Sequence, residues 1–524
     1  MFTLLTFIGY TLFVALYSWY TLRKENLSST DGYFLGGRSL TGIVIAGSML
    51  LTNISTEHLI GMNGSSYKNG FIIIAWEITS ALALVLAALY FIPKYLKMGL
   101  TTIPQYLEER FDKTTRTLVA FFLMISFIVT LLPIVLYTGA LNLESIFNVS
   151  EVLGVNQQKG ITLTVIAIGC IGACYAIIGG LKAVAVSDTV NGYGLLIGGL
   201  AIPSIALYQI GEGNLWNGLQ TVYAHAPEKF NVIGASDSVL PFEVLFTGLI
   251  INQLYFWSMN QTIIQRALGA KNLVEAQKGL LFTGVLKILV PLIIILPGVI
   301  GFYYYDDSLY DNQDLVYPEL IKKVLPVGFI GLFAAIVMGA VLSTFNSVLN
   351  SAATIFSVDI YKGTLNPKSD EKKMVRVGKG TSLVLAVFAI AVAPWVANAP
   401  DGLYQLLQQL NGIFFIPIAS IMLAGFFTQY ISAKAAKTAL FIGLVFYLFT
   451  TFITPVDLHF VHLWGIEFLL NVAVMFAVSY FYPQEQKPSV SQTPLLELKT
   501  WKYTTPFSIG LCVITVAIYI ALGI

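Results

Sequence analysis

Residues 53–64, NISTEHLIGMNG, place an unusual set of polar groups inside an apolar region of the chain. The stretch carries two amides, Asn53 and Asn63, a carboxylate, Glu57, and an imidazole, His58. Apolar runs flank it, TGIVIAGSMLLT before it and FIIIAWEITSALALVLAALYF after it. Burying an ionisable side chain in a bilayer costs at least ~2.5–3.5 kcal/mol, so such a group faces a cavity or a partner. The stretch therefore predicts a polar site between helices.

Similar polar side chains recur in other apolar segments of the chain. A single one is explained equally well by a structural hydrogen bond between two helices. Several of them in separate segments favour a water-accessible binding site instead. These side chains are Glu77, Asp188, Gln253, Lys287, Gln408 and Gln409.

The segment 41–66 is predicted to be a helix that breaks near its middle. It contains Gly61 and Gly64 together with polar residues, all of which are weak helix formers. A break frees backbone carbonyls at membrane depth, which is tolerated only where they line a cavity or hold an ion. Carbonyl oxygens are suitable ligands for hard cations, and those of Leu51 and Ile54 would lie near the break.

The run GAVLSTFNSVLNSAATIF supplies further oxygen atoms on a long apolar segment. Ser343 and Ser347 are four residues apart and therefore share one face of a helix. Small hydroxyl residues in membrane helices commonly serve helix packing. Beside a broken helix, we interpret the cluster as part of a cation site. Its members are Ser343, Thr344, Asn346, Ser347 and Asn350.

Composition identifies the setting of these groups as a membrane. The 524 residues are 56% hydrophobic and 11% charged, whereas a soluble domain has about 25% charged residues. Windows of roughly 20 apolar residues predict an all-α membrane protein with about fourteen spans. The predicted spans are 2–20, 41–66, 71–93, 117–145, 160–178, 188–210, 242–264, 279–304, 327–361, 380–398, 402–426, 437–454, 460–482 and 505–523.

The distribution of lysine and arginine predicts the orientation in the membrane. With the N-terminus outside, most of the 29 basic residues fall in cytoplasmic loops. Lys287 lies within a span, and an even number of spans returns the C-terminus to the outside. Short loops favour a bacterial inner membrane. The basic residues that fall in outer loops are Lys68, Lys159, Lys229, Lys322 and Lys323.

No polar segment is long enough to form a soluble catalytic domain, so we expect no enzyme. One pattern resembles a metal site, because His459 and His462 are spaced i, i+3 and Asp457 is close by. We interpret these as interfacial histidines, since a complete metal site needs further ligands. The three cysteines lie in apolar segments and indicate packing rather than a disulfide framework.

Ordered blocks along nearly the whole chain resemble the sodium/solute symporter family, and within it the branch of bacterial sodium/glucose and sodium/galactose symporters. The resemblance implies a core of two inverted five-helix repeats, similar to the leucine-transporter fold, in which the first helix of each repeat is discontinuous. The blocks are NISTEHLIGMNG, AWEITSA, YAIIGGLKAVAVSDTVNGYGLLIGG, LYFWSMNQTIIQRALGAKNLVEAQKG, LSTFNSVLNSAATIFSVDIYK and LYQLLQQLNG.

The same resemblance divides the chain into five parts. Sodium, a sugar and the lipid bilayer are the implied partners, with no nucleic acid, and the oligomeric state is left open, a dimer included. The parts are an N-terminal helix with a cytoplasmic linker (1–38), the first repeat (39–211), an external loop (212–241), the second repeat (242–428) and three accessory helices (429–524).

The resemblance also implies a sugar site built from the core helices. Ring hydroxyls both donate and accept hydrogen bonds, so amide, carboxylate and ammonium groups suit their edges. An aromatic side chain suits the apolar face of a pyranose. The implied substrate-binding residues are Asn53, His58, Glu77, Ser80, Gln253, Phe256, Trp257, Lys287 and Gln408.

Gate positions are implied in the same way, at Met62, Trp76, Phe256 and Tyr404. Simple packing is an equally open interpretation for Met62, Trp76 and Tyr404. In the family the aromatic residue at position 256 is usually a tyrosine whose hydroxyl reaches the asparagine of the broken helix. Phe256 keeps the ring and loses that bond, which leaves Asn53 to find another partner.

The resemblance implies a sodium site made of backbone carbonyls and hydroxyls, namely Leu51, Ile54, Ala340, Ser343 and Thr344. Some family members hold a second sodium ion. Here a second site stays open, although an asparagine replaces one expected serine. Its members would be Asp188, Ser343, Asn346 and Ser347. Asp188 otherwise pairs with a buried base or lies at the cytoplasmic mouth.

These observations predict a secondary transporter that couples inward sodium movement to uptake of a neutral hexose by alternating access. A symporter for another small polar solute, such as an inositol, a sialic acid or an amino acid, is the main alternative. A sugar sensor on the same fold would bind sugar without sodium-driven uptake. A channel is disfavoured, because a broken-helix cation site indicates an occluded pathway rather than a continuous pore.

Overall fold

The structure, a computed structural model, describes residues 2–23, 27–396, 403–484 and 498–523. Within these residues every regular element is helical, apart from one isolated parallel bridge between Leu40 and Ala270. Eleven of the described helices are long and apolar enough to cross a membrane. The end of the predicted span 380–398 and the start of 402–426 fall outside the described residues. The prediction of an all-α membrane protein is confirmed.

Two sets of helices follow one another along the chain. The first set is α1 (Phe2–Leu22), α2 (Thr30–Phe34), α3 (Gly42–Asn53), α4 (Asn63–Asn69), α5 (Ala75–Ile78), α6 (Ser80–Leu86), α7 (Ile92–Lys97), α8 (Ile103–Arg110), α9 (Lys113–Ser126), α10 (Leu132–Phe147), α11 (Val149–Leu153) and α12 (Gln157–Ile210). The second set is α13 (Leu215–His225), α14 (Gly248–Ser258), α15 (Gln261–Leu268), α16 (Leu273–Tyr305), α17 (Val316–Val324), α18 (Val327–Ile355), α19 (Glu371–Val392), α20 (Leu403–Phe427), α21 (Ala433–Leu448), α22 (Phe460–Phe481) and α23 (Thr504–Leu522).

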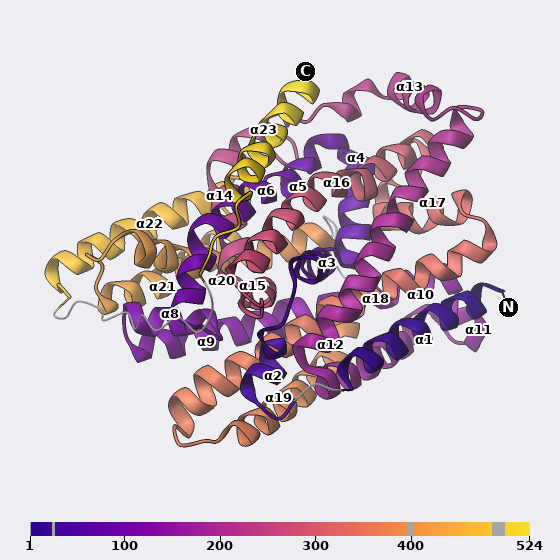
Figure 1. Cartoon of the computed structure of the whole chain (residues 1–524). Coiled ribbons are helices and arrows are strands. Elements are labelled where there is room, and N and C mark those ends of the chain that lie inside the picture. The colour runs from indigo at the N-terminus through magenta and orange to yellow at the C-terminus, as the bar shows by residue number, and fades with distance from the viewer. Residues whose placement is uncertain (1, 24–26, 397–402, 485–497, 524) are drawn as a thin grey trace.

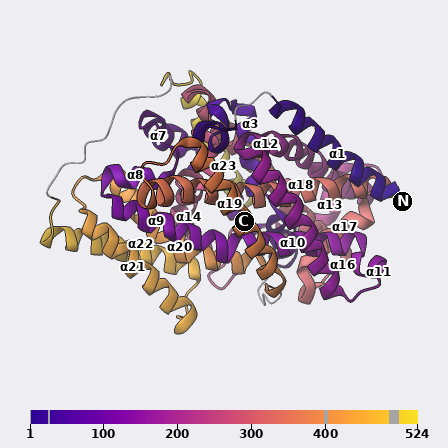
Figure 2. The ribbon, with the colours of Figure 1, turned by 90° about the horizontal axis from the view of Figure 1, so that it is seen from below.

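The middle of the molecule is formed by α3, α12, α16 and α18. α12 packs against both α3 and α18, and α16 packs against both α3 and α4. α1 and the α21–α22 pair lie on opposite flanks of this centre in Figure 1, and Figure 2 shows the same separation from below. The helices near the two ends of the chain therefore surround a core contributed by both sets.

The segment predicted to be a broken helix is interrupted where expected. α3 ends at Asn53, and Ile54 has an extended backbone with ψ 97°. The amides of His58 and Leu59 both bond to the carbonyl of Ser55. The chain then continues as a wide π-helical turn, η2 (Glu57–Met62), before α4. Such wide turns are frequent at functional sites, and this one displays polar side chains at the centre of the bundle.

A second interruption separates α14 from α15. α14 ends at Ser258, and the amides of Met259 and Asn260 both bond to the carbonyl of Tyr255. Asn260 then caps α15, because its side-chain oxygen accepts from the amide of Thr262. Asparagine is a preferred residue at this position. The two segments that the resemblance implies as first helices of the repeats are thus both interrupted.

Two predicted spans, 160–178 and 188–210, run into one another as α12. They are separated by Gly180, whose φ of +58° departs from helical geometry. A Cβ atom here would lie 2.5 Å from the carbonyl oxygen of Tyr33, so only glycine allows this close approach. Because α12 joins two spans and other spans are split, the exact number of fourteen stays a prediction.

The connection between α13 and α14 folds back onto the end of α4. The ammonium of Lys229 donates to the carbonyls of Lys68 at 2.7 Å and Tyr67 at 3.3 Å. It also lies 4.2 Å from the centre of the Phe302 ring. Burial lowers the pKa of Lys229, and the neighbouring carboxylate of Glu228 opposes that shift. The last carbonyls of α4 are therefore satisfied by a cation, as is favourable at a helix C-terminus.

Gly298 of α16 provides a test of this packing. A Cβ atom there would lie 2.0 Å from Ser66 Oγ and 2.5 Å from the carbonyl oxygen of Asn63. Gly298→Ala is expected to destabilise the protein by about 1–3 kcal/mol through overpacking, measured as a lower unfolding temperature in detergent. Gly510→Ala on α23 meets no heavy atom within 4 Å and serves as the control. Equal unfolding temperatures for the two variants would contradict the packing described.

Candidate functional site

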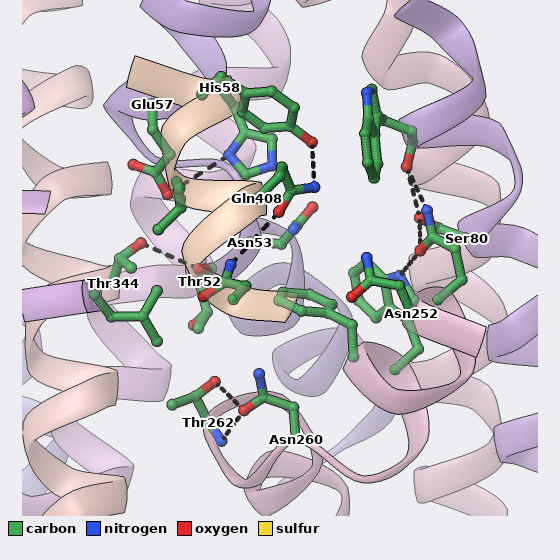
Figure 3. Close-up of a pocket in the computed structure, with 18 of the residues that line it drawn as sticks. Thr52, Asn53, Glu57, His58, Ser80, Asn252, Asn260, Thr262, Thr344 and Gln408 are labelled. Atoms are coloured by element: carbon green, nitrogen blue, oxygen red, sulfur yellow. Dashed lines mark hydrogen bonds and ion pairs between the residues drawn. The ribbon is translucent and has the colours of Figure 1, made fainter. Parts of the chain in front are cut away.

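A cavity lies where both interrupted helices meet α5, α6, α16, α18 and α20. Thr52 and Asn53 lie at one side of it, Ser80 and Asn252 lie opposite, and Asn260 lies at one end (Figure 3). The nine residues predicted to bind substrate all line this cavity, although their roles stay predictions. They are Asn53, His58, Glu77, Ser80, Gln253, Phe256, Trp257, Lys287 and Gln408.

A buried ion pair crosses the cavity wall between Lys287 of α16 and Glu77 of α5. Each side chain is 1% exposed. The same ammonium donates to Asn53 Oδ1 at 2.6 Å and lies 5.5 Å from the centre of the Trp257 ring. Lys287 therefore supplies the partner that Asn53 lacks when phenylalanine stands at position 256. A buried pair is stable only when further hydrogen bonds complete it, and Asn53 provides one.

Gln253 of α14 is held by three hydrogen bonds within the protein. Its Nε2 donates to the carbonyl of Trp76 at 2.7 Å. Its Oε1 accepts from Ser80 Oγ at 3.0 Å and from Trp257 Nε1 at 3.1 Å. Gln253, which is predicted to bind the sugar, thus orients the side chains of Ser80 and Trp257. It also joins α14 to α5 and α6.

His58 lies between two carboxylates. Its Nδ1 is 3.6 Å from Glu57 Oε1, and its Nε2 is 4.0 Å from Glu77 Oε1. Glu57 also lines the cavity, and its second oxygen has no hydrogen-bond partner among the described residues. The η2 turn therefore brings an acceptor and a ring nitrogen to the same wall (Figure 3).

Aromatic rings close the cavity beside His58. Tyr404 of α20 packs edge-on against His58 at 5.3 Å and against Trp76 at 5.9 Å between ring centres. Its hydroxyl accepts from Gln408 Nε2 at 3.1 Å. Three of the predicted gate residues, Trp76, Phe256 and Tyr404, line the cavity, whereas Met62 is buried and does not.

One residue of the predicted sodium site, Thr344, contacts the break after α3. Thr344 Oγ1 of α18 donates to the carbonyl of Thr52 at 3.1 Å, which ties α18 to the break. Ser343 Oγ is buried and makes no hydrogen bond within the described part of the chain. A buried hydroxyl without a partner is compatible with an oxygen-ligated alkali cation. Leu51, Ile54 and Ala340 would complete that set.

Asp188 has a basic partner that the sequence alone did not identify. Its Oδ2 accepts from Ser48 Oγ at 2.7 Å and lies 3.7 Å from Arg266 Nη2. The guanidinium also bonds Ser347 Oγ, one member of the open second sodium site. Asp188 Oδ1 and Asn346 Oδ1 stay without a partner among the described residues. Two members of the predicted second sodium site, Asp188 and Ser347, therefore already contact the Arg266 guanidinium. Whether sodium binds there stays a prediction.

Sequence reasoning missed several lining residues, notably Asn252, Asn260 and Asn411. Asn252 lies four positions before Phe256, so helical spacing offers a signal for it. The histidines at 459 and 462 bind protein groups instead, since His462 Nδ1 lies 3.1 Å from Thr247 Oγ1. No group of three candidate metal ligands occurs in the part of the chain that the structure describes.

A polar cavity between two interrupted helices, inside a bundle of membrane-length helices, is the arrangement of a secondary transporter. The chain belongs to the sodium:solute symporter family, whose model matches residues 33–443. It is therefore a transporter and not an enzyme, and sodium is its coupling ion.

Three relatives cover much of the chain. It is 44% identical over 520 residues to the uncharacterized symporter YidK of Escherichia coli, covering 99% of this chain and 91% of the relative. It is 33% identical over 494 residues to the sodium/glucose cotransporter of Vibrio parahaemolyticus, covering 90% and 89%. It is 30% identical over 466 residues to the human sodium/myo-inositol cotransporter, covering 82% and 63%.

A solved structure shares the fold. The substrate-bound outward-open Na⁺-coupled sialic acid symporter matches with a TM-score of 0.80 and 20% identity, covering 93% of this chain and 99% of that one. This likeness supports the leucine-transporter-like architecture that the sequence implies.

The ion pair of Lys287 with Glu77 predicts an asymmetric mutational response. Lys287→Met leaves a buried carboxylate without its cation and is expected to cost about 3–5 kcal/mol of stability. Adding Glu77→Gln removes the stranded charge and should restore part of the loss, measured by chemical or thermal unfolding in detergent. Lys278→Met breaks a partly exposed pair with Glu275 and should cost at most about 1 kcal/mol. A double variant no more stable than Lys287→Met would contradict the pairing.

The predicted sodium site is tested at Ser343. Ser343→Ala removes one oxygen and is expected to raise the sodium concentration for half-maximal transport by about tenfold, because a hydrogen-bond-sized ligand energy is lost. Ser351→Ala on the same helix removes a serine that bonds Gln265 and should leave that concentration unchanged. Equal sodium dependence of both variants and the wild type would place the ion elsewhere.

Proposed function

We propose that this protein carries a neutral hexose of the glucose or galactose type into the cell together with sodium, by alternating access. The proposal extends the sodium:solute symporter assignment to a substrate. Sodium/glucose cotransport in the Vibrio relative supports it, and the chemistry of the cavity supports it independently.

The observation that carries the proposal is the charge balance of the cavity. Among the described lining residues, Lys287 is the single lysine or arginine, and it is already bonded to Glu77 and Asn53. His58 faces two carboxylates. A solute with a carboxylate would find no unpaired cation here, whereas sugar hydroxyls would find acceptors and amides. This argues against sialic acid or an amino acid as the substrate.

Coupling follows if sodium binds at the break after α3. The ion would hold Leu51 and Ile54 against Ser343 and Thr344 of α18, next to Asn53 in the cavity wall. Sodium would thereby raise the affinity for sugar, and by thermodynamic reciprocity sugar would raise the affinity for sodium. Each positive charge that crosses gains about 2.3 kcal/mol per 100 mV, which is enough to accumulate a neutral solute. The helices would rock around a nearly fixed central site.

An inositol is the second candidate. The human sodium/myo-inositol relative supports it, and a cyclitol offers the same ring of hydroxyls without a charge. The proposal further includes the predicted orientation with both termini outside, the five-part division of the chain and a bacterial inner membrane, which the E. coli relative supports. The proposed transport cycle does not require a dimer.

Uptake into proteoliposomes tests the function. Purified protein is expected to accumulate labelled glucose or galactose under an inward sodium gradient and not under a potassium gradient of equal size. Glu77→Ala should abolish this uptake, because it removes a sugar acceptor and strands the Lys287 ammonium. Glu319→Ala, whose carboxylate forms an exposed pair with Lys322, is the control. Unchanged uptake by Glu77→Ala would contradict the assignment of the site.

A further inference from the structure

Three residues of α14 and its break point form one stripe along the cavity. Asn252, Phe256 and Asn260 follow one another at four-residue spacing, which places helical residues on one face. All three line the cavity. Asn252 is 5% exposed and Asn260 is 1% exposed, so both amides are buried. Figure 3 shows Asn252 on one wall and Asn260 beyond it, at the end near Thr262.

The orientation of the Asn260 amide is fixed by its role as a helix cap. Its oxygen accepts from the backbone N–H of Thr262 at 3.0 Å and from the Thr262 hydroxyl at 2.7 Å. The backbone N–H can only donate, so the atom facing it must be the oxygen. The free end of the side chain is therefore Nδ2, a donor, and it has no partner among the described residues.

Asn252 differs from its neighbour Gln253. The amide of Gln253 already bonds Trp76, Ser80 and Trp257, which uses both acceptor positions of its oxygen and one of its two N–H groups. Asn252 Oδ1 is buried and has no partner in the described chain. Nothing fixes which end of this amide faces the cavity, so Asn252 can accept or donate. Buried amide atoms without partners are uncommon in folded proteins and require an explanation.

We propose that Asn252 and Asn260 determine substrate specificity by binding hydroxyls at opposite ends of a six-membered polyhydroxylated ring whose apolar face covers Phe256. The inference rests on the proposed function and narrows it to uncharged pyranoses and cyclitols. The two amides supply hydrogen bonds in addition to the one N–H that Gln253 has left. A site built this way rejects a ring that lacks a matched hydroxyl, because the buried amide is then left unpaired.

Deoxy analogues of the transported ring test this directly. In wild-type proteoliposomes, at least two single-deoxy analogues should compete about 10- to 100-fold less well than the parent ring. Asn252→Leu, in which the new side chain is similar in size, should abolish the discrimination against one of these analogues. Its discrimination against the other analogue should stay unchanged. Asn260→Ser retains an oxygen to cap α15 and should abolish discrimination against the other one only. The sodium concentration for half-maximal uptake should stay within twofold.

Asn142→Leu is the matched control. Asn142 is another buried membrane amide without a partner among the described residues, but it does not line the cavity, so its variant should retain the wild-type profile. If Asn252→Leu and Asn260→Ser both transport and keep the full profile, or lose the same preference, the inference is overturned while the proposed function stands. If wild-type protein takes up no pyranose and no cyclitol, the proposed function fails, and the inference fails with it. If Asn252→Leu does not fold, the same outcomes are read from Asn252→Ser.

Discussion

Lys287 is the charge on which the arrangement of the site depends. It reaches from α16 to Asn53 at the end of α3 and to Glu77 on α5. An unpaired lysine at membrane depth costs free energy, so the fold must place Asn53 and Glu77 within bonding distance of it. The bond between Lys287 and Asn53 holds the C-terminal end of α3 against α16. The bond to Glu77 leaves the one lysine among the described lining residues already paired with a carboxylate.

The break after α3 connects the predicted ion site to the solute cavity. Asn53 faces the cavity, and the preceding residue, Thr52, accepts at its carbonyl from Thr344 of α18. An ion held between α3 and α18 would therefore act on Asn53 through one or two residues of backbone. Arg266 places a permanent cation beside Asp188 and also bonds Ser347 of α18, which balances that carboxylate within the protein. Linkage between two ligands requires that one ligand favour the conformation that binds the other, and a shared backbone segment provides such a connection.

Much of this could be predicted from sequence because the bilayer makes polar groups informative. Hydropathy located the helices, and the cost of burial marked Glu77, Lys287 and Asn53 as candidate site residues, all of which line the cavity. The pairings could not be predicted, since they depend on how α3, α5 and α16 approach one another. Asn252 and Gln253 are adjacent amides that both line the cavity, and only the structure shows that Gln253 bonds protein groups whereas Asn252 Oδ1 has no partner among the described residues. Arg266 was missed because it lies in the short α15, in a segment where basic residues also signal topology.

The most direct test is equilibrium binding of the sugar to purified protein in sodium and in potassium salt at equal ionic strength. Mutual stabilisation across the α3 break predicts that sodium lowers the dissociation constant of the sugar about tenfold or more, corresponding to a coupling of ~1.4 kcal/mol. Equal dissociation constants in the two salts would contradict it, because the ion and the solute would then bind independently.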